Sequence, residues 1–118
     1  NQTGTFNTAL TDQGAFNGGD NDVFIDQIGL DDFAEVSQNS SLNEADIDQA
    51  GTGGLNEALI SQGFFGGGDD NLATIDQSAG SGNLSTIIQN VATAGGNNTA
   101  SSTQVGDGNT SFPLRMAL

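Results

Sequence analysis

The side chains of this sequence that could do chemistry are almost all amides and carboxylates. Asn and Gln recur six residues apart, as in Asn43 and Gln49, among 15 Asp and Glu residues. Cys, His, Tyr and Trp are absent and Arg115 is the single basic residue, which excludes thiolate, imidazole and amine chemistry and soft metal ligands. Carboxylate pairs alone could support glycoside hydrolysis, but no excess of apolar or aromatic residues accompanies them to form a pocket. We therefore expect a protein that is not an enzyme.

The charge and length of the chain limit its partners and its architecture. The formal net charge is -14, and because phosphate recognition requires a basic surface, we expect no nucleic-acid partner. No apolar run approaches the roughly 20 residues needed to cross a bilayer, so we expect no membrane insertion. With 118 residues we expect a single domain, 1–118, and the absence of cysteine removes disulfides as a source of stability.

A seven-residue unit, Asn-x-Ala-x-Ile-x-Gln, recurs along nearly the whole chain. Its copies cover residues 7–13, 21–27, 32–38, 43–49, 56–62, 71–77, 83–89 and 98–104. The first, third, fifth and seventh residues of a unit share one face of a β-strand, whereas a helix would scatter them. The third and fifth positions form a stripe of small and then branched apolar residues. This stripe predicts a core that includes Val23, Ile25, Val36, Ile47, Ile60, Ile75 and Ile87.

The segments between units are short and rich in Gly, Asn, Asp and Ser, which is typical of turns. Their lengths join the units in pairs, and the predicted two-strand rungs span residues 1–13, 21–38, 43–62, 71–89 and 98–118. One rung alone has too thin an inner face to be stable, but stacked rungs share a core and a backbone ladder. We therefore predict an all-β fold, a β-solenoid of about five strand–arch–strand rungs in parallel, in-register sheets, with cross-β geometry once assembled.

Stacking of the rungs places identical amide residues above one another. Such columns can hydrogen-bond side chain to side chain along the axis, which satisfies amides that are costly to bury. The predicted Gln columns are Gln27, Gln49, Gln77 and Gln104 in one sheet and Gln13, Gln38, Gln62 and Gln89 in the other. The predicted Asn columns, at the strand starts, contain Asn7, Asn21, Asn43, Asn56, Asn71, Asn83 and Asn98.

These motifs resemble the curlin repeat family, the subunits of curli fibres, whose repeat reads SxxxxxQxGxxNxAxxxQ. Its QxGxxN part appears as Gln2, Gly4 and Asn7, as Gln104, Gly106 and Asn109, and, with Asp in place of Asn, as Gln27, Gly29 and Asp32. The resemblance extends to about Ser111 and implies an extracellular amyloid fibre with a structural role in biofilm matrix and adhesion. It also implies the partners of such a subunit, which are copies of itself, a nucleator subunit and an outer-membrane secretion pore.

Stacking also aligns outward carboxylates, with Asp26, Asp48 and Asp76 in one column. At a spacing of about 5 Å each neighbouring pair costs roughly 1 kcal/mol in water, so we expect assembly to accelerate at acidic pH, with salt or with divalent cations. The alternative is an acidic face that only keeps the chain soluble. We expect no cofactor. The acidic Gly loops 18–22 and 66–71 offer oxygen ligands for calcium, but they lack the spacing of the calcium β-roll repeat, and plain turns are the competing interpretation.

Apolar residues also lie at the C-terminus and on surfaces. Phe112, Leu114, Met116 and Leu118 alternate with other residues and predict a terminal strand, in which Pro113 removes one ladder donor. This strand either folds back as a cap or makes the end contact with the incomplete first rung of the next copy. Five aromatic residues are expected in loops or on outer faces, namely Phe16, Phe24, Phe33, Phe64 and Phe65. Their exposure indicates lateral contacts between filaments or with a surface. The alternative is that they are scattered surface residues without a role.

These observations together predict a secreted structural subunit that self-assembles end to end into an extracellular fibre. The alternative is a monomeric or surface-anchored β-solenoid adhesin, in which the repeat builds a binding face instead of a polymer.

Overall fold

The structure, a computed structural model, describes residues 1–14, 19–51, 53–63, 70–89 and 97–115. The regular elements of this part of the chain are all strands. It contains no helix that is long and apolar enough to cross a membrane. The strands are β1 (Gln2–Thr5), β2 (Thr8–Gln13), β3 (Asp22–Leu30), β4 (Phe33–Gln38), β5 (Glu44–Ala50), β6 (Glu57–Gln62), β7 (Leu72–Ser78), β8 (Leu84–Gln89), β9 (Thr99–Val105), β10 (Thr110–Ser111) and β11 (Leu114–Arg115).

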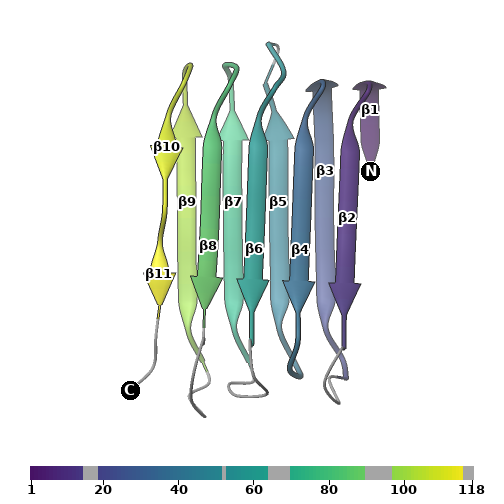
Figure 1. The fold of residues 1–118 in the computed structure, drawn as a ribbon, viewed down its shortest axis with the longest axis vertical. Helices are drawn as coiled ribbons and strands as arrows, with labels where there is room; N and C mark the ends of the chain where they lie inside the picture. The colour runs from purple at the N-terminus through teal and green to yellow at the C-terminus, as the bar shows by residue number, and fades with distance from the viewer. Residues whose placement is uncertain (15–18, 52, 64–69, 90–96, 116–118) are drawn as a thin grey trace.

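The strands form two parallel sheets that face each other. The first sheet has the order β1-β3-β5-β7-β9, and the second has the order β10-β8-β6-β4-β2, with β11 also paired to β8. From β1 to β10, odd-numbered and even-numbered strands therefore alternate between the two walls, and the chain winds from one end of the stack to the other (Figure 1). The predicted all-β solenoid with parallel sheets is confirmed.

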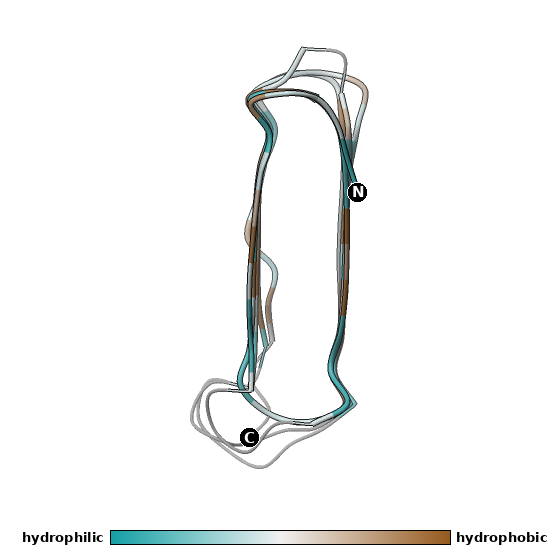
Figure 2. Cartoon of the chain, turned by 90° about the vertical axis from the view of Figure 1, so that its right-hand side faces the viewer, coloured by the Kyte–Doolittle hydropathy of each residue, from teal (hydrophilic) through white to brown (hydrophobic). Residues whose placement is uncertain are grey.

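Strand register aligns the repeat units position by position. Ile25 pairs with Ile47 and Ile47 with Ile75 in the first sheet, while Val36 pairs with Ile60 in the second. Because alternate residues point to opposite faces, this register directs every apolar stripe into the space between the walls. Viewed along the stack, apolar residues lie midway along both walls and hydrophilic residues lie toward the corners (Figure 2).

The core is a thin column of branched and small side chains. Val36, Ile47, Ile60, Ile75 and Ile87 are buried, and a small buried residue stands two positions before each of them, Ser85 before Ile87 and Ala before the others. Val23 and Ile25, which the repeat assigned to the core, are only partly buried. The reason is that β1 pairs with β3 only over residues 27–30 of β3, so residues 22–26 have β5 on one side and no described strand on the other.

Each described strand of the repeat from β2 to β10 begins after a residue with a left-handed backbone. This residue directly precedes the first Asn or Asp of the unit, and its φ is close to +60° whether it is Asp31, Leu42, Leu55 or Gly82. The repeated conformation turns the chain through the same corner in every rung, so successive rungs superimpose. Glycine adopts this region without strain, while Leu does so at a cost of roughly 1–2 kcal/mol.

Candidate self-assembly interface

A ladder of glutamine side chains runs along the whole first sheet. In each step the Nε2 of one Gln donates to the Oε1 of the next, at 2.7 Å from Gln2 to Gln27 and at 2.9 Å for the three later steps. The members of this ladder are Gln2, Gln27, Gln49, Gln77 and Gln104. All donors point from the N-terminal rung toward the C-terminal rung, so the ladder has a direction.

The second sheet carries a glutamine ladder with the same direction. Its steps are 2.9 to 3.0 Å long and join Gln13, Gln38, Gln62 and Gln89. Each interior Gln also donates across to a backbone carbonyl of the opposite sheet, as Gln49 does to Phe33 at 3.0 Å and Gln62 to Glu44 at 3.1 Å. The ladders therefore connect successive rungs, and they also connect the two sheets at the ends of the strands.

The asparagine columns run in the opposite direction. The backbone N–H and the Nδ2 of Asn43 both donate to Oδ1 of Asn21 on the preceding rung, at 2.9 and 3.3 Å. The same pattern continues through the column to Asn71 and Asn98, and the second sheet has its own column through Asn7, Asp32, Asn56, Asn83 and Asn109. The strand starts are thus fixed by side chains that cap the backbone of the rung above.

Asp32 interrupts the second asparagine column with a buried carboxyl group. It is 1% exposed, its Oδ1 accepts from the backbone N–H and Nδ2 of Asn56, and its Oδ2 is buried without a hydrogen-bond partner among the described residues. Desolvation raises the pKa of Asp32 above its usual value of 3.8, against the lowering effect of the two bonds from Asn56, and the neighbouring Asp31 adds to the rise. The repeat shows the substitution at this position, but not that the carboxyl group is buried.

The two ends of the stack present complementary amide groups. At the C-terminal end, Gln104 Nε2 donates to the Leu84 carbonyl at 2.9 Å, and in the described part of the chain no further Gln lies above it. At the N-terminal end, Gln2 uses Nε2 to donate to Gln27, which leaves Oε1 as the acceptor that faces outward along the ladder. A second copy stacked head to tail therefore continues the ladder with a bond from Gln104 to its Gln2.

The N-terminal end is also hollow. A depression of about 400 Å³ lies between the two walls, lined by Asn1, Gln2, Ala9, Thr11, Val23 and Ile25. It occupies the place where a full first strand would lie beside the first half of β3. This geometry explains the partial exposure of the Val23 and Ile25 side chains.

The C-terminal residues pair with their own chain. β10 and β11 add to β8 in parallel, with Ser111 opposite Ser85 and Leu114 opposite Ile88. Phe112 and Leu114, which the sequence assigned to an end contact, are 63% and 56% exposed. Ser111 and not Phe112 stands at the inward position, because the register follows Asn109 as the start of the unit. Met116 and Leu118 lie outside the described residues.

The predicted acidic column lies on the outer side of the first sheet. Asp26 pairs with Asp48 and Asp48 with Asp76. The pKa of Asp48 is raised, first by partial burial and then by the carboxylates of Asp76, Asp26 and Asp46. One oxygen of Asp76 is buried and has no hydrogen-bond partner among the described residues. Repulsion among these carboxylates therefore opposes the stacking of β3, β5 and β7 within the chain.

Within the described residues, no three acidic side chains converge as a metal site would require. Of the Gly loops considered for calcium, residues 18 and 66–69 lie outside the described residues, while 19–22 and 70–71 are described. Phe16, Phe64 and Phe65 also lie outside the described residues. Phe24 and Phe33 lie on the outer faces of opposite sheets.

Comparisons with protein-family models, with curated proteins and with solved structures found no match to this chain.

Proposed function

We propose that the chain is a structural subunit of an extracellular amyloid fibre, which grows by head-to-tail stacking of copies and serves in biofilm matrix and surface adhesion. The observation that carries the proposal is the directional glutamine ladder, whose two ends carry opposite hydrogen-bonding groups. A stack of copies extends this ladder and the parallel sheets with the pairing already present inside one chain. The extracellular site and the biofilm role come from the resemblance to the curlin repeat. The same resemblance suggests a nucleator subunit and an outer-membrane secretion pore as partners.

The open edges of the sheets support the same proposal. At the two ends of β2, the N–H groups of Thr8 and Gly14 donate to the carbonyls of Asp32 and Gln38, on the side of β4. Because alternate residues of a parallel strand bond to opposite neighbours, the N–H of Thr11 points to the open edge. Unpaired edges of this kind are templates for another strand, and monomeric proteins usually block them.

A first experiment is quiescent incubation of the purified chain, followed by electron microscopy and fibre diffraction. We expect fibres with a meridional reflection near about 4.7 Å. Thr11→Pro removes the edge N–H without breaking a bond inside the chain, so it should lower the rate of elongation from wild-type seeds, whereas Thr11→Val keeps the N–H and should elongate like the wild type. A strand-rich chain that stays monomeric for days would refute the fibre proposal.

One observation favours a second candidate, a monomeric or surface-anchored adhesin. The pairing of β10 and β11 with β8 covers part of the last rung with a segment that contains Pro113, which cannot donate to a further strand. In this case the segment is a cap. Deletion of residues 112–118 separates the two functions, because it would convert a capped monomer into a polymer but would not be needed for fibres of the wild-type chain.

A further inference from the structure

The two outer faces of the solenoid differ in charge and in apolar character. The first sheet carries six outward carboxylates, which belong to Asp22, Asp26, Glu44, Asp46, Asp48 and Asp76. The second sheet carries three, which belong to Asp12, Glu35 and Glu57. Its other outward residues include the apolar side chains of Leu10, Phe33, Leu59, Leu84, Ile88, Phe112 and Leu114.

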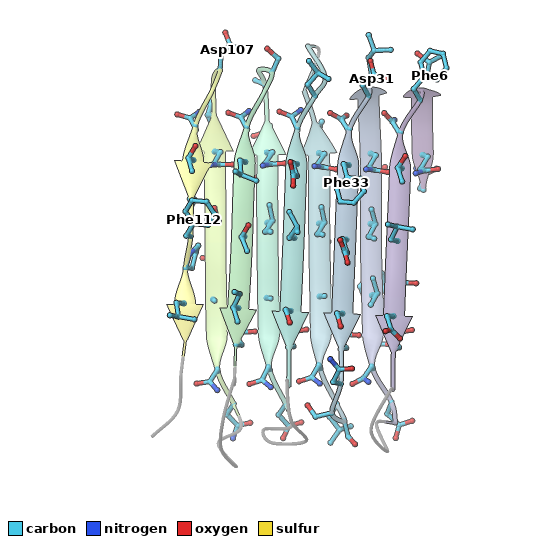
Figure 3. The ribbon with its side chains drawn as sticks, viewed as in Figure 1. Phe6, Asp31, Phe33, Asp107 and Phe112 are labelled. Carbon is cyan, nitrogen blue, oxygen red and sulfur yellow. The ribbon has the colours of Figure 1, made fainter. Side chains whose placement is uncertain are left out.

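Two carboxylates interrupt this apolar surface in register, because Glu35 lies between Leu10 and Leu59 and Glu57 lies between Phe33 and Leu84. Ile88 lies beside Leu114 in register, and Leu59 lies next to Thr86. Phe33 and Phe112 stand on this same face, over β4 and next to β10 (Figure 3). A hollow of about 320 Å³ opens over β4, β6 and β8, lined by Glu35, Ser37, Leu59, Ile60, Ser61, Thr86 and Ile88. It exists because Ser37 and Ser61, which are neighbours in register, are small.

We propose that the outer face of the second sheet is the surface through which two stacks of this chain pack side by side, while the acidic face of the first sheet stays in solvent. The inference rests on the proposed fibre, because it concerns contacts between stacks. The occupant of the face is a second copy of the chain. Charge decides the choice of face, since closing two first sheets would bring six carboxylates against six others, and the described strands of that sheet carry no Lys or Arg.

The size of the face explains why stacks, and not single chains, would pair. Six residues at about 3.3 Å and five rungs at about 4.8 Å give a face of roughly 480 Å² per copy. Two such faces bury about 1,000 Å² in total, at the lower limit for a specific interface. Single chains therefore gain little by pairing. In a stack the same face repeats with every copy, so the contact grows with the length of the fibre.

A two-fold axis along the stack gives the two faces matching shapes. It makes facing strands antiparallel, so the outward residue at the second position of a seven-residue unit lies over the outward residue at the sixth position of the facing unit. Phe33 of one copy then lies over Ser37 of the other, at the edge of the hollow, and Leu84 lies over Ile88. Large residues thus meet small ones and apolar residues meet apolar ones.

The test compares fibres of two variants that add the same charge to opposite faces of one rung. Leu84→Asp changes the first outward residue of β8, and Leu72→Asp changes the matching residue of β7. We expect wild-type and Leu72→Asp fibres to have twice the mass per unit length of Leu84→Asp fibres, measured by scanning transmission electron microscopy. The inference would be overturned if wild-type fibres were single stacks, or if both variants reduced paired stacks to single stacks equally. Either result would still establish the fibre itself.

A second pair of variants covers the case in which Leu84→Asp does not fold. Glu35→Gln removes a charge from the apolar face, while Asp46→Asn removes one from the middle of the acidic face. We expect Glu35→Gln to raise the fraction of paired stacks at least two-fold at low salt and Asp46→Asn to leave it unchanged. An increase with Asp46→Asn alone would contradict the assignment of the faces. Failure of every variant and of the wild type to form any fibre would instead reject the proposed function, and the lateral contact with it.

Discussion

The Gln49 side chain donates from Nε2 to Oε1 of Gln77 at 2.9 Å, one rung further along the stack, and both residues are fully buried. The same nitrogen donates to the Phe33 carbonyl of the opposite sheet at 3.0 Å. One buried amide group therefore donates both a hydrogen bond along the ladder and a hydrogen bond between the two sheets. Stability should depend on such interior amides more than on those at the ends.

Gln49→Leu tests this dependence. The substitution leaves the Gln77 Oε1 and the Phe33 carbonyl without the donor they have now. Because a buried group without a partner costs about 1–3 kcal/mol, we expect a loss of at least about 2 kcal/mol in the free energy of unfolding, measured by urea denaturation of the monomer. Gln13→Leu, at the exposed start of the other ladder, should cost less than half as much. Equal losses would show that the interior ladder does not control stability.

Asp32→Asn should stabilise the fold at neutral pH. Because burial raises the pKa of Asp32 in the folded state above 3.8, the folded chain binds a proton more readily than the unfolded chain. The contribution of Asp32 to the stability of the wild type is therefore most favourable below a pH of 3.8 and is lost as the pH rises through the folded pKa. Asn carries no charge, and its amide group matches the rest of the column.

The measurement for Asp32→Asn is the urea midpoint between pH 3 and pH 8. We expect Asp32→Asn to have a higher urea midpoint than the wild type at pH 7. The difference between the two midpoints should shrink as the pH falls below 3.8. The exposed neighbour provides the control, since Asp31→Asn keeps a residue type that tolerates the left-handed backbone there and should change the midpoint little. A wild type that is more stable than Asp32→Asn at pH 7 would contradict the assigned cost of the buried carboxylate.

Asp48→Asn should weaken the pH dependence of assembly. Partial burial and the carboxylates of Asp76 and Asp26 raise the pKa of Asp48, so its unfavourable contribution is absent at low pH and appears as the pH rises through that pKa. Wild-type thioflavin-T lag times should be shorter at pH 4 than at pH 8, and the variant should narrow this difference. The effect should also shrink in about 0.5 M salt, because exposed charges are screened over a few ångströms there.

A matched control for Asp48 is Asp20→Asn, which removes an exposed charge at a corner outside the column. Both substitutions change the net charge equally. If Asp20→Asn narrows the pH difference as much as Asp48→Asn, net charge and not the column governs assembly.

Leu55→Gly should stabilise the corner before β6. Leu55 has a φ of +61° and is 67% exposed, so its side chain contributes little packing in return for the backbone strain. We expect a gain of up to about 1 kcal/mol in the free energy of unfolding, reduced by the larger chain entropy of glycine in the unfolded state. Leu59→Gly, in the extended backbone of β6, should destabilise the fold. A loss of stability with Leu55→Gly would mean that the left-handed corner is not strained.

The columns of the fold followed from the repeat, while the corners did not. Alternation in units such as 43–49 and 56–62 determines which side chains face inward, and equal spacing determines which residues share a column. In contrast, Leu42 and Leu55 are types that ordinarily avoid a left-handed backbone, so they give no sign of it. Only the closure of each rung on the one below imposes that conformation.

The sequence by itself determined the strands, their inward faces and the amide columns, because these depend on periods of two and seven residues along the chain. The tertiary structure decided how completely each member is covered. It left Val23 and Ile25 half exposed beside a short β1, buried the Asp32 carboxyl group, and turned Phe112 outward. These outcomes depend on which strand lies next to each residue and on where strand pairing starts and stops. The sequence repeat determines neither, because it describes only residues close together along the chain.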